Sequence, residues 1–197
     1  MAFRDDDSNG THACKPAKLE DRMEECLLDS RTVILSVEVT GEGSGLYRKL
    51  AWLYAKDPGK EVRIILNSPG GEVYDGITIY NMIRHFTGKG MPVEVEVMGL
   101  CASMATVVLQ AATRRVACRH TRFLLHEVSE FKLFSDETAT EKEEEARELG
   151  IVNRMLAGIL AERAGRQVED VLMAIKRHEL WMSAEEAREW GLVDEVR

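Results

Sequence analysis

The chain has 197 residues, of which 45% are hydrophobic and 30% are charged, a profile typical of a globular protein with one well-buried core. Its formal charge of -8 argues against general binding of nucleic acid, because such binding depends on clustered lysines and arginines that neutralise phosphates. No apolar run is long enough for a signal peptide or a membrane span. From the charge and the missing apolar run together, we expect neither nucleic acid nor a membrane among its partners.

The cysteine pattern and the N-terminal composition set the expected organisation. The four cysteines form no CxxC pair, which predicts neither a zinc site nor a disulfide framework and favours the reducing cytoplasm. Residues 1–18 are polar and rich in Asp, Gly and Ser, so we expect a flexible arm there. Residues 19–197 are then expected to form a single domain.

The first half of that domain alternates between helical and strand patterns. Helices are predicted over residues 19–28 and 46–55, and apolar strands over residues 32–37 and 62–66. NSPGG follows the second strand and precedes a helix over residues 73–86. The same order recurs in a strand over residues 92–98, a turn at 99–103 and a helix at 104–112. Repeated βαβ units of this kind predict an α/β fold with parallel strands and right-handed crossovers.

The second half predicts two short strands and then mainly helices. The strands cover residues 115–118 and 122–126, and a long amphipathic helix runs over residues 138–164. Its acidic segment EKEEEARE is interpreted as a solvated helix face. A helix over residues 167–176 and a short strand over 180–182 follow. Ser183 to Glu186 then has the pattern of a capping box that opens a last helix, which ends at Gly191.

Ser103 is the candidate nucleophile. It lies in MGLCASMATVV, where a strand gives way to an alanine-rich helix, and the helix N-terminus offers the amide of Met104 to a developing negative charge. A serine at this position is also a common N-cap, and Cys101 is a second possible nucleophile two residues earlier. A free cysteine among small residues is more often a buried packing residue.

The SPGG segment is the candidate source of a second oxyanion donor and of room for a peptide substrate. Pro69 restricts the approach of the chain, whereas Gly70 and Gly71 can adopt backbone angles that other residues avoid. The alternative is a plain turn between a strand and a helix.

The general base should be a histidine, because its pKa lies near neutrality. Among the five histidines, His126 closes the apolar strand RFLLH, and strand ends are where open α/β sheets place their sites. His12 belongs to the arm, His85 to a helix end and His120 to a polar turn. A partly buried structural histidine is the other interpretation of His126.

Four ordered motifs make the chain resemble ClpP, the barrel-forming proteolytic subunit of the Clp proteases. They are NSPGG (67–71), GLCASMA (99–105), RFLLH (122–126) and MSAEEAREWGLVDEV (182–196). The resemblance covers residues 19–197 and implies a ClpP/crotonase-type spiral of βαβ units with a protruding handle helix. It also implies a serine endopeptidase that cleaves through an acyl-enzyme on Ser103.

The resemblance assigns roles residue by residue. Ser103 falls on the nucleophile, His126 on the base, and Gly71 and Met104 on the oxyanion amides, with Gly70 beside them as a substrate-binding position. The family's third catalytic residue is an aspartate, whose place Glu179 takes. A glutamate keeps the charge that stabilises imidazolium, but its extra methylene changes where the carboxylate ends. If Glu179 does not serve, Asp136 is another source of a third group.

Other departures concern regulation. Glu127-Val128 replaces the family's usual Gln-Pro, SEFKLFS (129–135) lacks its glycines, and Arg177 and His178 replace an Asp-Arg pair that links ring assembly to activity. Arg63 and Ile65 stand where the family has aromatic docking sites for unfoldase loops. These changes bear on substrate fit, on ring contacts and on the choice of unfoldase.

The resemblance also implies partners. We expect a homo-oligomer of stacked heptameric rings, protein or peptide substrates, and an AAA+ unfoldase of the ClpX or ClpA/ClpC type. No GxxxxGK[ST] loop is present, so no cofactor is expected in this chain and ATP would be used by the unfoldase.

Two other functions remain open. A weak or inactive ClpP-like ring subunit would explain the changes at Glu179, Arg177 and Glu127. A crotonase-type enzyme acting on acyl-CoA shares the βαβ spiral and an oxyanion hole, although Ser103 and His126 together favour hydrolysis.

Overall fold

The computed structural model describes residues 18–36, 38–41, 43–128, 139–176 and 178–197. The expected arm therefore lies outside the described residues except for Lys18, as do Asp136, the segment 129–135 and Arg177. Within the described part, none of the helices combines the length and the apolar character needed to cross a membrane.

Seven strands in the described part of the chain form one sheet. They are β1 (Thr32–Leu35), β2 (Val62–Ser68), β3 (Val93–Ala102), β4 (Arg114–Ala117), β5 (Arg122–Leu125), β6 (Leu180–Ser183) and β7 (Glu195–Val196). Five of them pair in parallel in the order β1-β2-β3-β4-β7. The parallel strands predicted from the βαβ pattern are confirmed.

β3 is the strand at which the sheet divides. Its first half, Glu94 to Val97, pairs with β4, and its last residues, Leu100 to Ala102, pair with β5. β5 in turn pairs antiparallel with β6. The carboxyl ends of β3 and β5 therefore lie side by side, and Ser103 and His126 are the residues that follow them.

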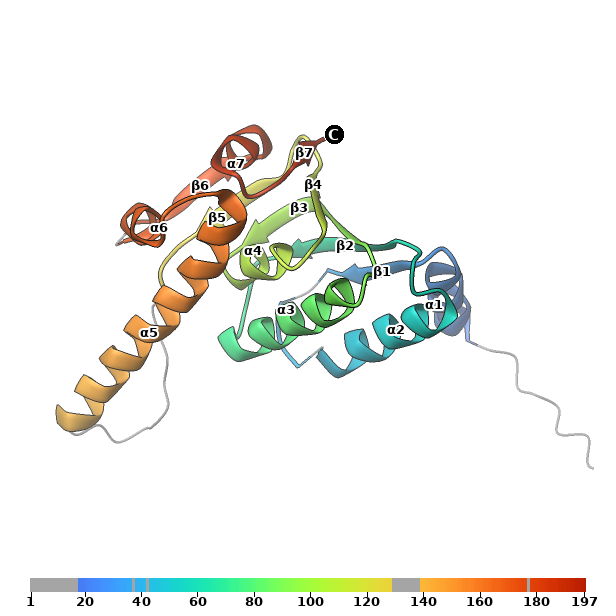
Figure 1. The fold of residues 1–197 in the computed structure, drawn as a ribbon, viewed down its shortest axis with the longest axis horizontal. Coiled ribbons are helices and arrows are strands. Elements are labelled where there is room, and N and C mark those ends of the chain that lie inside the picture. Colours follow the sequence, from blue (N-terminus) through green and yellow to red (C-terminus); the bar gives the residue numbers. More distant parts are fainter. Residues whose placement is uncertain (1–17, 37, 42, 129–138, 177) are drawn as a thin grey trace, which may run out of the picture.

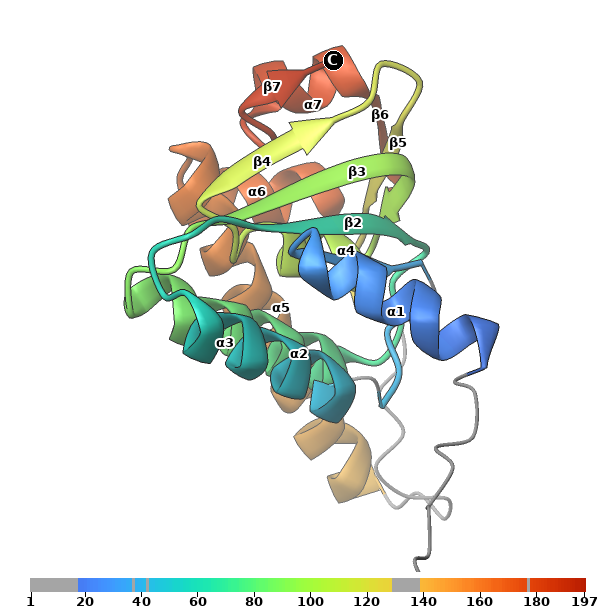
Figure 2. The same ribbon diagram turned by 90° about the vertical axis from the view of Figure 1, so that its right-hand side faces the viewer.

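The helices are α1 (Leu19–Asp29), α2 (Gly43–Lys56), α3 (Val73–Gly88), α4 (Met104–Leu109), α5 (Ala139–Ala164), α6 (Val168–Ile175) and α7 (Ala184–Trp190). α2, α3 and α4 cover one face of the sheet (Figures 1 and 2). The 26-residue α5 packs on α4 and α6 at one end and projects away from the sheet at the other (Figure 1). This is the place expected for the handle helix.

The core lies between the sheet and these helices. Val62, Ile64 and Leu66 of β2 are at most 1% exposed, and they alternate with residues of the opposite sheet face. On that face Arg63 pairs with Glu94 and Glu96, so a site expected by resemblance to be aromatic carries ion pairs instead.

Local structure departs from the sequence prediction at three places. β3 continues through residues 99–102, which were predicted as a turn, because an irregularity in its pairing with β2 absorbs them. Asn67 accepts a hydrogen bond from the Leu100 amide there. α4 ends at Leu109 because Thr113 pairs with Val93 and leads into β4. β7 was not predicted, since its two residues depend on distant β4 for pairing.

Candidate active site

Ser103 lies on a sharp turn between β3 and α4. Its φ of 54° is positive, a conformation that residues other than glycine rarely adopt and that often marks a functional site. The Ser103 amide donates to the Leu124 carbonyl at 2.9 Å, which ties the turn to β5. The hydroxyl does not cap the helix. The alternative role of a simple N-cap is therefore not the one seen in this structure.

Gly70 and Gly71 form the backing of this turn, and both have positive φ, 96° and 149°. A Cβ on Gly70 would lie 2.6 Å from Cβ of Ser103, and one on Gly71 would lie 2.8 Å from the Val39 amide nitrogen. Val39 also holds the segment by bonds from its own amide to the Gly70 carbonyl and from the Glu72 amide to its carbonyl. Only glycines fit between the Val39 segment and the Ser103 turn.

The amides of Gly71 and Met104 are the candidate oxyanion donors. Neither donates a hydrogen bond to any residue that the structure describes. The two glycines and Met104 are close neighbours, because a Cβ on Gly70 would lie 3.0 Å from the Met104 nitrogen. Gly71 and Met104 also line the same cavity as Ser103. Two unpaired amides beside a nucleophile form the arrangement that stabilises a tetrahedral oxyanion.

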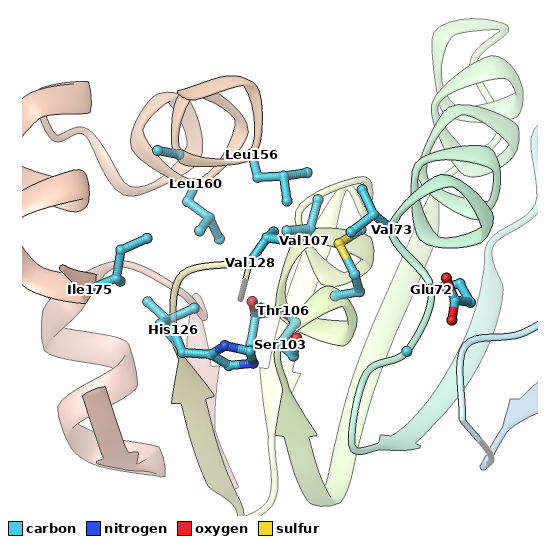
Figure 3. A pocket seen from close by; sticks show the side chains of 14 residues that line it. Glu72, Val73, Ser103, Thr106, Val107, His126, Val128, Leu156, Leu160 and Ile175 are labelled. Atoms are coloured by element: carbon cyan, nitrogen blue, oxygen red, sulfur yellow. Dashed lines mark hydrogen bonds between the residues drawn. The ribbon is translucent and has the colours of Figure 1, made fainter. Parts of the chain in front are cut away.

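His126 faces Ser103 in this cavity. It follows β5 directly, and Figure 3 shows its ring turned toward the Ser103 side chain. Over the described part of the chain, neither the Ser103 hydroxyl nor Nε2 of His126 has a hydrogen-bond partner. Catalytic hydrogen bonds are often completed only when substrate binds, so the two groups stay available to one another.

The other ring nitrogen of His126 is already occupied. Nδ1 lies 2.6 Å from the main-chain carbonyl oxygen of Glu127. A carbonyl can only accept, so Nδ1 donates, and in the neutral ring the lone pair then lies on Nε2. This is the tautomer that a general base needs in order to take the Ser103 proton.

Glu179 directly precedes β6, as His126 directly follows β5, and no hydrogen bond joins the two side chains. The paired part of β5 and β6 ends at Leu125 and Leu180, and a continuation of this register by one residue would set Glu179 opposite His126. The Glu179 carboxylate instead accepts a hydrogen bond from the indole nitrogen of Trp181 at 2.9 Å. Glu179 is exposed and does not line the cavity.

A cavity of about 240 Å³ with apolar side chains on one part of its wall extends from the two catalytic candidates. Its lining includes Val107, Val128, Leu156, Leu160 and Ile175, which come from α4, α5, α6 and the segment after β5 (Figure 3). The sequence prediction did not identify these residues as site residues. Apolar positions at helical spacing indicate a buried face, and only the tertiary packing shows that part of that face borders a cavity.

Cys101 and Gly70 complete the set of sequence candidates. Cys101 is fully buried, and burial raises the pKa of its thiol far above the usual range, so the thiol stays protonated and unreactive. Gly70 packs behind Ser103 and is not part of the cavity lining. No group of three metal-ligating side chains converges anywhere in the described residues.

The fold and cavity are those of an α/β serine hydrolase. The family model described as Clp protease matches residues 17–197. The ATP-dependent Clp protease proteolytic subunit 1 of Protochlamydia amoebophila is 36% identical over 92% of this chain and 87% of that protein. Subunit 1 of Chlamydia pneumoniae is 35% identical over 91% and 93% of the two chains.

A solved structure agrees with these relatives. A point mutant of ClpP1 from Listeria monocytogenes has a TM-score of 0.77 and 27% identity, over 89% of this chain and 95% of that one. The chain belongs to the Clp protease family. It is a serine-type endopeptidase of that family, as the ordered motifs predicted.

Proposed function

We propose that Ser103 is the nucleophile of this peptidase and His126 its general base. Nε2 of His126 takes the hydroxyl proton while Oγ attacks the scissile carbonyl, and the proton then passes to the leaving amine as the acyl-enzyme forms. Water attacks the ester in the second half, with His126 again as base, and the acid product leaves. The observation that carries this proposal is the strained Ser103 turn facing the His126 ring across one cavity.

The backbone amides of Gly71 and Met104 serve as the oxyanion hole. Their freedom from other acceptors in the described chain supports this role, as does their position on the cavity wall with Ser103. The side chains of Val107, Leu156, Leu160 and Ile175 favour a substrate with an apolar residue next to the scissile bond, because burying it there removes apolar surface from water.

Glu179 is proposed as the third catalytic residue. Its place opposite His126 in the extended β5–β6 register supports this assignment. The carboxylate would stabilise the imidazolium that forms during attack, a task that the neutral Glu127 carbonyl performs only in part.

Assembly and partners follow the family. We propose a homo-oligomer of two stacked heptameric rings, with α5 as the contact between rings, in the cytoplasm. An AAA+ unfoldase of the ClpX or ClpA/ClpC type would supply unfolded substrates and consume the ATP, so this chain would need no cofactor. The pairing of Arg63 with Glu94 and Glu96 favours an unfoldase loop with polar as well as apolar contacts.

A weakly active or inactive ring subunit is the second candidate function. Two observations favour it: the Glu179 carboxylate is bound by Trp181, and Nδ1 of His126 is bound by a neutral carbonyl. A site in this arrangement has a nucleophile and a base but lacks the charge that completes a triad.

A fluorophosphonate probe tests both functions. We expect the probe to label Ser103, which mass spectrometry of the labelled peptide identifies, and Ser103→Ala to abolish labelling and hydrolysis of small peptides. The oligomer should persist in native mass spectrometry, because loss of one hydroxyl costs little packing. Peptidase activity that survives in purified Ser103→Ala would refute the mechanism, and an unlabelled wild-type protein would favour the inactive subunit.

A further inference from the structure

A hydrogen bond between Trp181 and Glu179 lies at the beginning of β6. Alternation along the β5–β6 pair sets Leu124 and His126 on the same sheet face as Trp181 and Glu179. On this face the Trp181 indole donates to Glu179, and the Arg122 guanidinium lies 5.9 Å from the centroid of the Trp181 ring. Both the indole and the carboxylate are exposed, so water competes with the bond between them.

Two acceptors can serve Nδ1 of His126. One is the Glu127 carbonyl, which holds it in this structure, and the other is the Glu179 carboxylate, which a one-residue continuation of the β5–β6 register would set opposite. Directly opposed residues of an antiparallel pair have Cα atoms roughly 4.5–5.5 Å apart, a distance that a rotamer change of a glutamate can cover. Trp181 is the group that holds the carboxylate in its other position.

We propose that Trp181 is a positioning residue, a latch that keeps Glu179 away from His126. With the latch closed, the site works as a Ser103–His126 dyad oriented by the Glu127 carbonyl. With the latch open, Glu179 accepts from Nδ1 and completes a triad. The proposal rests on the proposed roles of Ser103 and His126. It gives Trp181 and the Glu127 carbonyl a part in orienting His126, which no sequence motif indicated.

Trp181→Phe opens the latch and keeps an aromatic ring beneath Arg122. We expect kcat for a small peptide to rise about fivefold, because a single exposed hydrogen bond shifts a two-state equilibrium by roughly that factor. The rise should vanish in Glu179→Gln, since the freed side chain then has no carboxylate to offer. Trp52→Phe is the matched control: Trp52 is 45% exposed against 44% for Trp181, and Lys56 lies 4.6 Å from its ring centroid.

The pH profile gives a reading that loss of packing would not produce. A carboxylate beside imidazole stabilises its protonated form, so the latch-open variant should have a raised His126 pKa and the acid limb of kcat/KM at higher pH. Glu72 is the other titratable side chain among the described residues lining the cavity, and it is the same in every variant. NMR titration of His126 in a Ser103→Ala background measures the same shift without catalysis.

The outcomes separate the latch from the mechanism. An unchanged or lower kcat in Trp181→Phe overturns the latch. The latch is also overturned if Trp181→Phe raises kcat by the same factor in the wild-type background and in the Glu179→Gln background. If fluorophosphonate labelling and activity still require Ser103 in that case, the proposed mechanism stands alone. If hydrolysis survives Ser103→Ala, the mechanism fails first, and the NMR titration still decides whether Glu179 reaches His126 when Trp181 is replaced.

Discussion

The two halves of the active site are held in different ways. On the nucleophile side, Gly70 and Gly71 are fixed between Val39 and the Ser103 turn, and the Ser103 amide is bonded to β5. On the base side, Glu179 and Trp181 are exposed and bonded to each other, and Nδ1 of His126 is bonded to the Glu127 carbonyl. The Ser103 turn is packed against buried backbone, whereas Glu179 and Trp181 on the base side are exposed side chains bonded to each other.

This difference indicates where a substitution can change the catalytic rate without disrupting the site. Strain at a non-glycine residue with positive φ persists only where the surroundings over-determine the conformation, and Ser103 meets that condition. A contact between two exposed side chains has an energy close to that of thermal fluctuation. Substitutions that disturb the backbone of the Ser103 turn should therefore abolish most of the activity. Substitutions of Glu179 or Trp181 should change kcat by smaller, graded amounts.

Gly71→Ala is expected to have the largest effect of the substitutions considered below. A Cβ there meets the Val39 backbone, so the segment must move, and the Gly71 amide would leave its proposed position in the oxyanion hole. Loss of one such donor costs about 10²–10³-fold in kcat. Steady-state peptidase kinetics measure the loss, and thermal unfolding measures the strain.

Gly88→Ala is the control for Gly71→Ala. Gly88 ends α3, and a Cβ on it would meet nothing within 4 Å. We expect wild-type kcat and an equal or higher melting temperature, because alanine favours helix over glycine. A Gly71→Ala enzyme that keeps wild-type kcat would show that the turn is not fixed as its contacts suggest.

Glu179→Gln is expected to have an intermediate effect. If Glu179 supports His126 for part of the time, its amide should lower kcat by about tenfold or more, since the amide cannot stabilise imidazolium and favours the wrong tautomer. Folding should change little, because the side chain is exposed. A kcat within about threefold of wild type corresponds to less than 1 kcal/mol of barrier and would remove Glu179 from the catalytic machinery.

Glu179→Asp sharpens this test. It keeps the charge and restores the shorter carboxylate that the family has at this position. The aspartate carboxylate ends one methylene closer to the backbone, which changes its reach toward both Trp181 and His126. A kcat above that of wild type would show that the longer side chain favours the Trp181 contact, and a kcat equal to that of Glu179→Gln would show that charge alone does not suffice.

The backbone geometry around Ser103 could be predicted from the sequence, whereas the contacts of His126 and Glu179 could not, for a physical reason. Glycines that require positive φ and a serine between a strand and a helix leave a local pattern, and Gly70, Gly71 and Ser103 carry that geometry in the structure. The Glu127 carbonyl leaves no pattern, because every residue has one. Trp181 has the pattern of an ordinary strand residue, and only the structure shows that its indole binds the Glu179 carboxylate.

The same reasoning holds for the fold. α1, α3, α7 and most strands followed from local periodicity and capping, including the Ser183–Glu186 capping box and the left-handed Gly191. The extension of β3 through Gly99 did not. It depends on Asn67 of β2 accepting from the Leu100 amide, and a Cβ on Gly99 would lie 2.8 Å from Oδ1 of Asn67. Only strand pairing reveals such a contact.

Cys101→Ala is expected to have the smallest effect, and it separates the two candidate nucleophiles of the turn. Cys101 is fully buried in β3, two residues from Ser103, and burial raises the pKa of its thiol, so at neutral pH almost no thiolate forms. Its side chain faces the core instead of the cavity, which it does not line. Replacing sulfur by hydrogen should keep kcat within about twofold and lower the melting temperature slightly, since a small void is left in the core. Cys26→Ala, at an exposed cysteine of α1, is the control for general effects of removing a thiol. Complete loss of peptidase activity in a folded Cys101→Ala protein, together with retained activity in Ser103→Ala, would transfer the role of nucleophile to the thiol and require the Ser103 turn to rearrange.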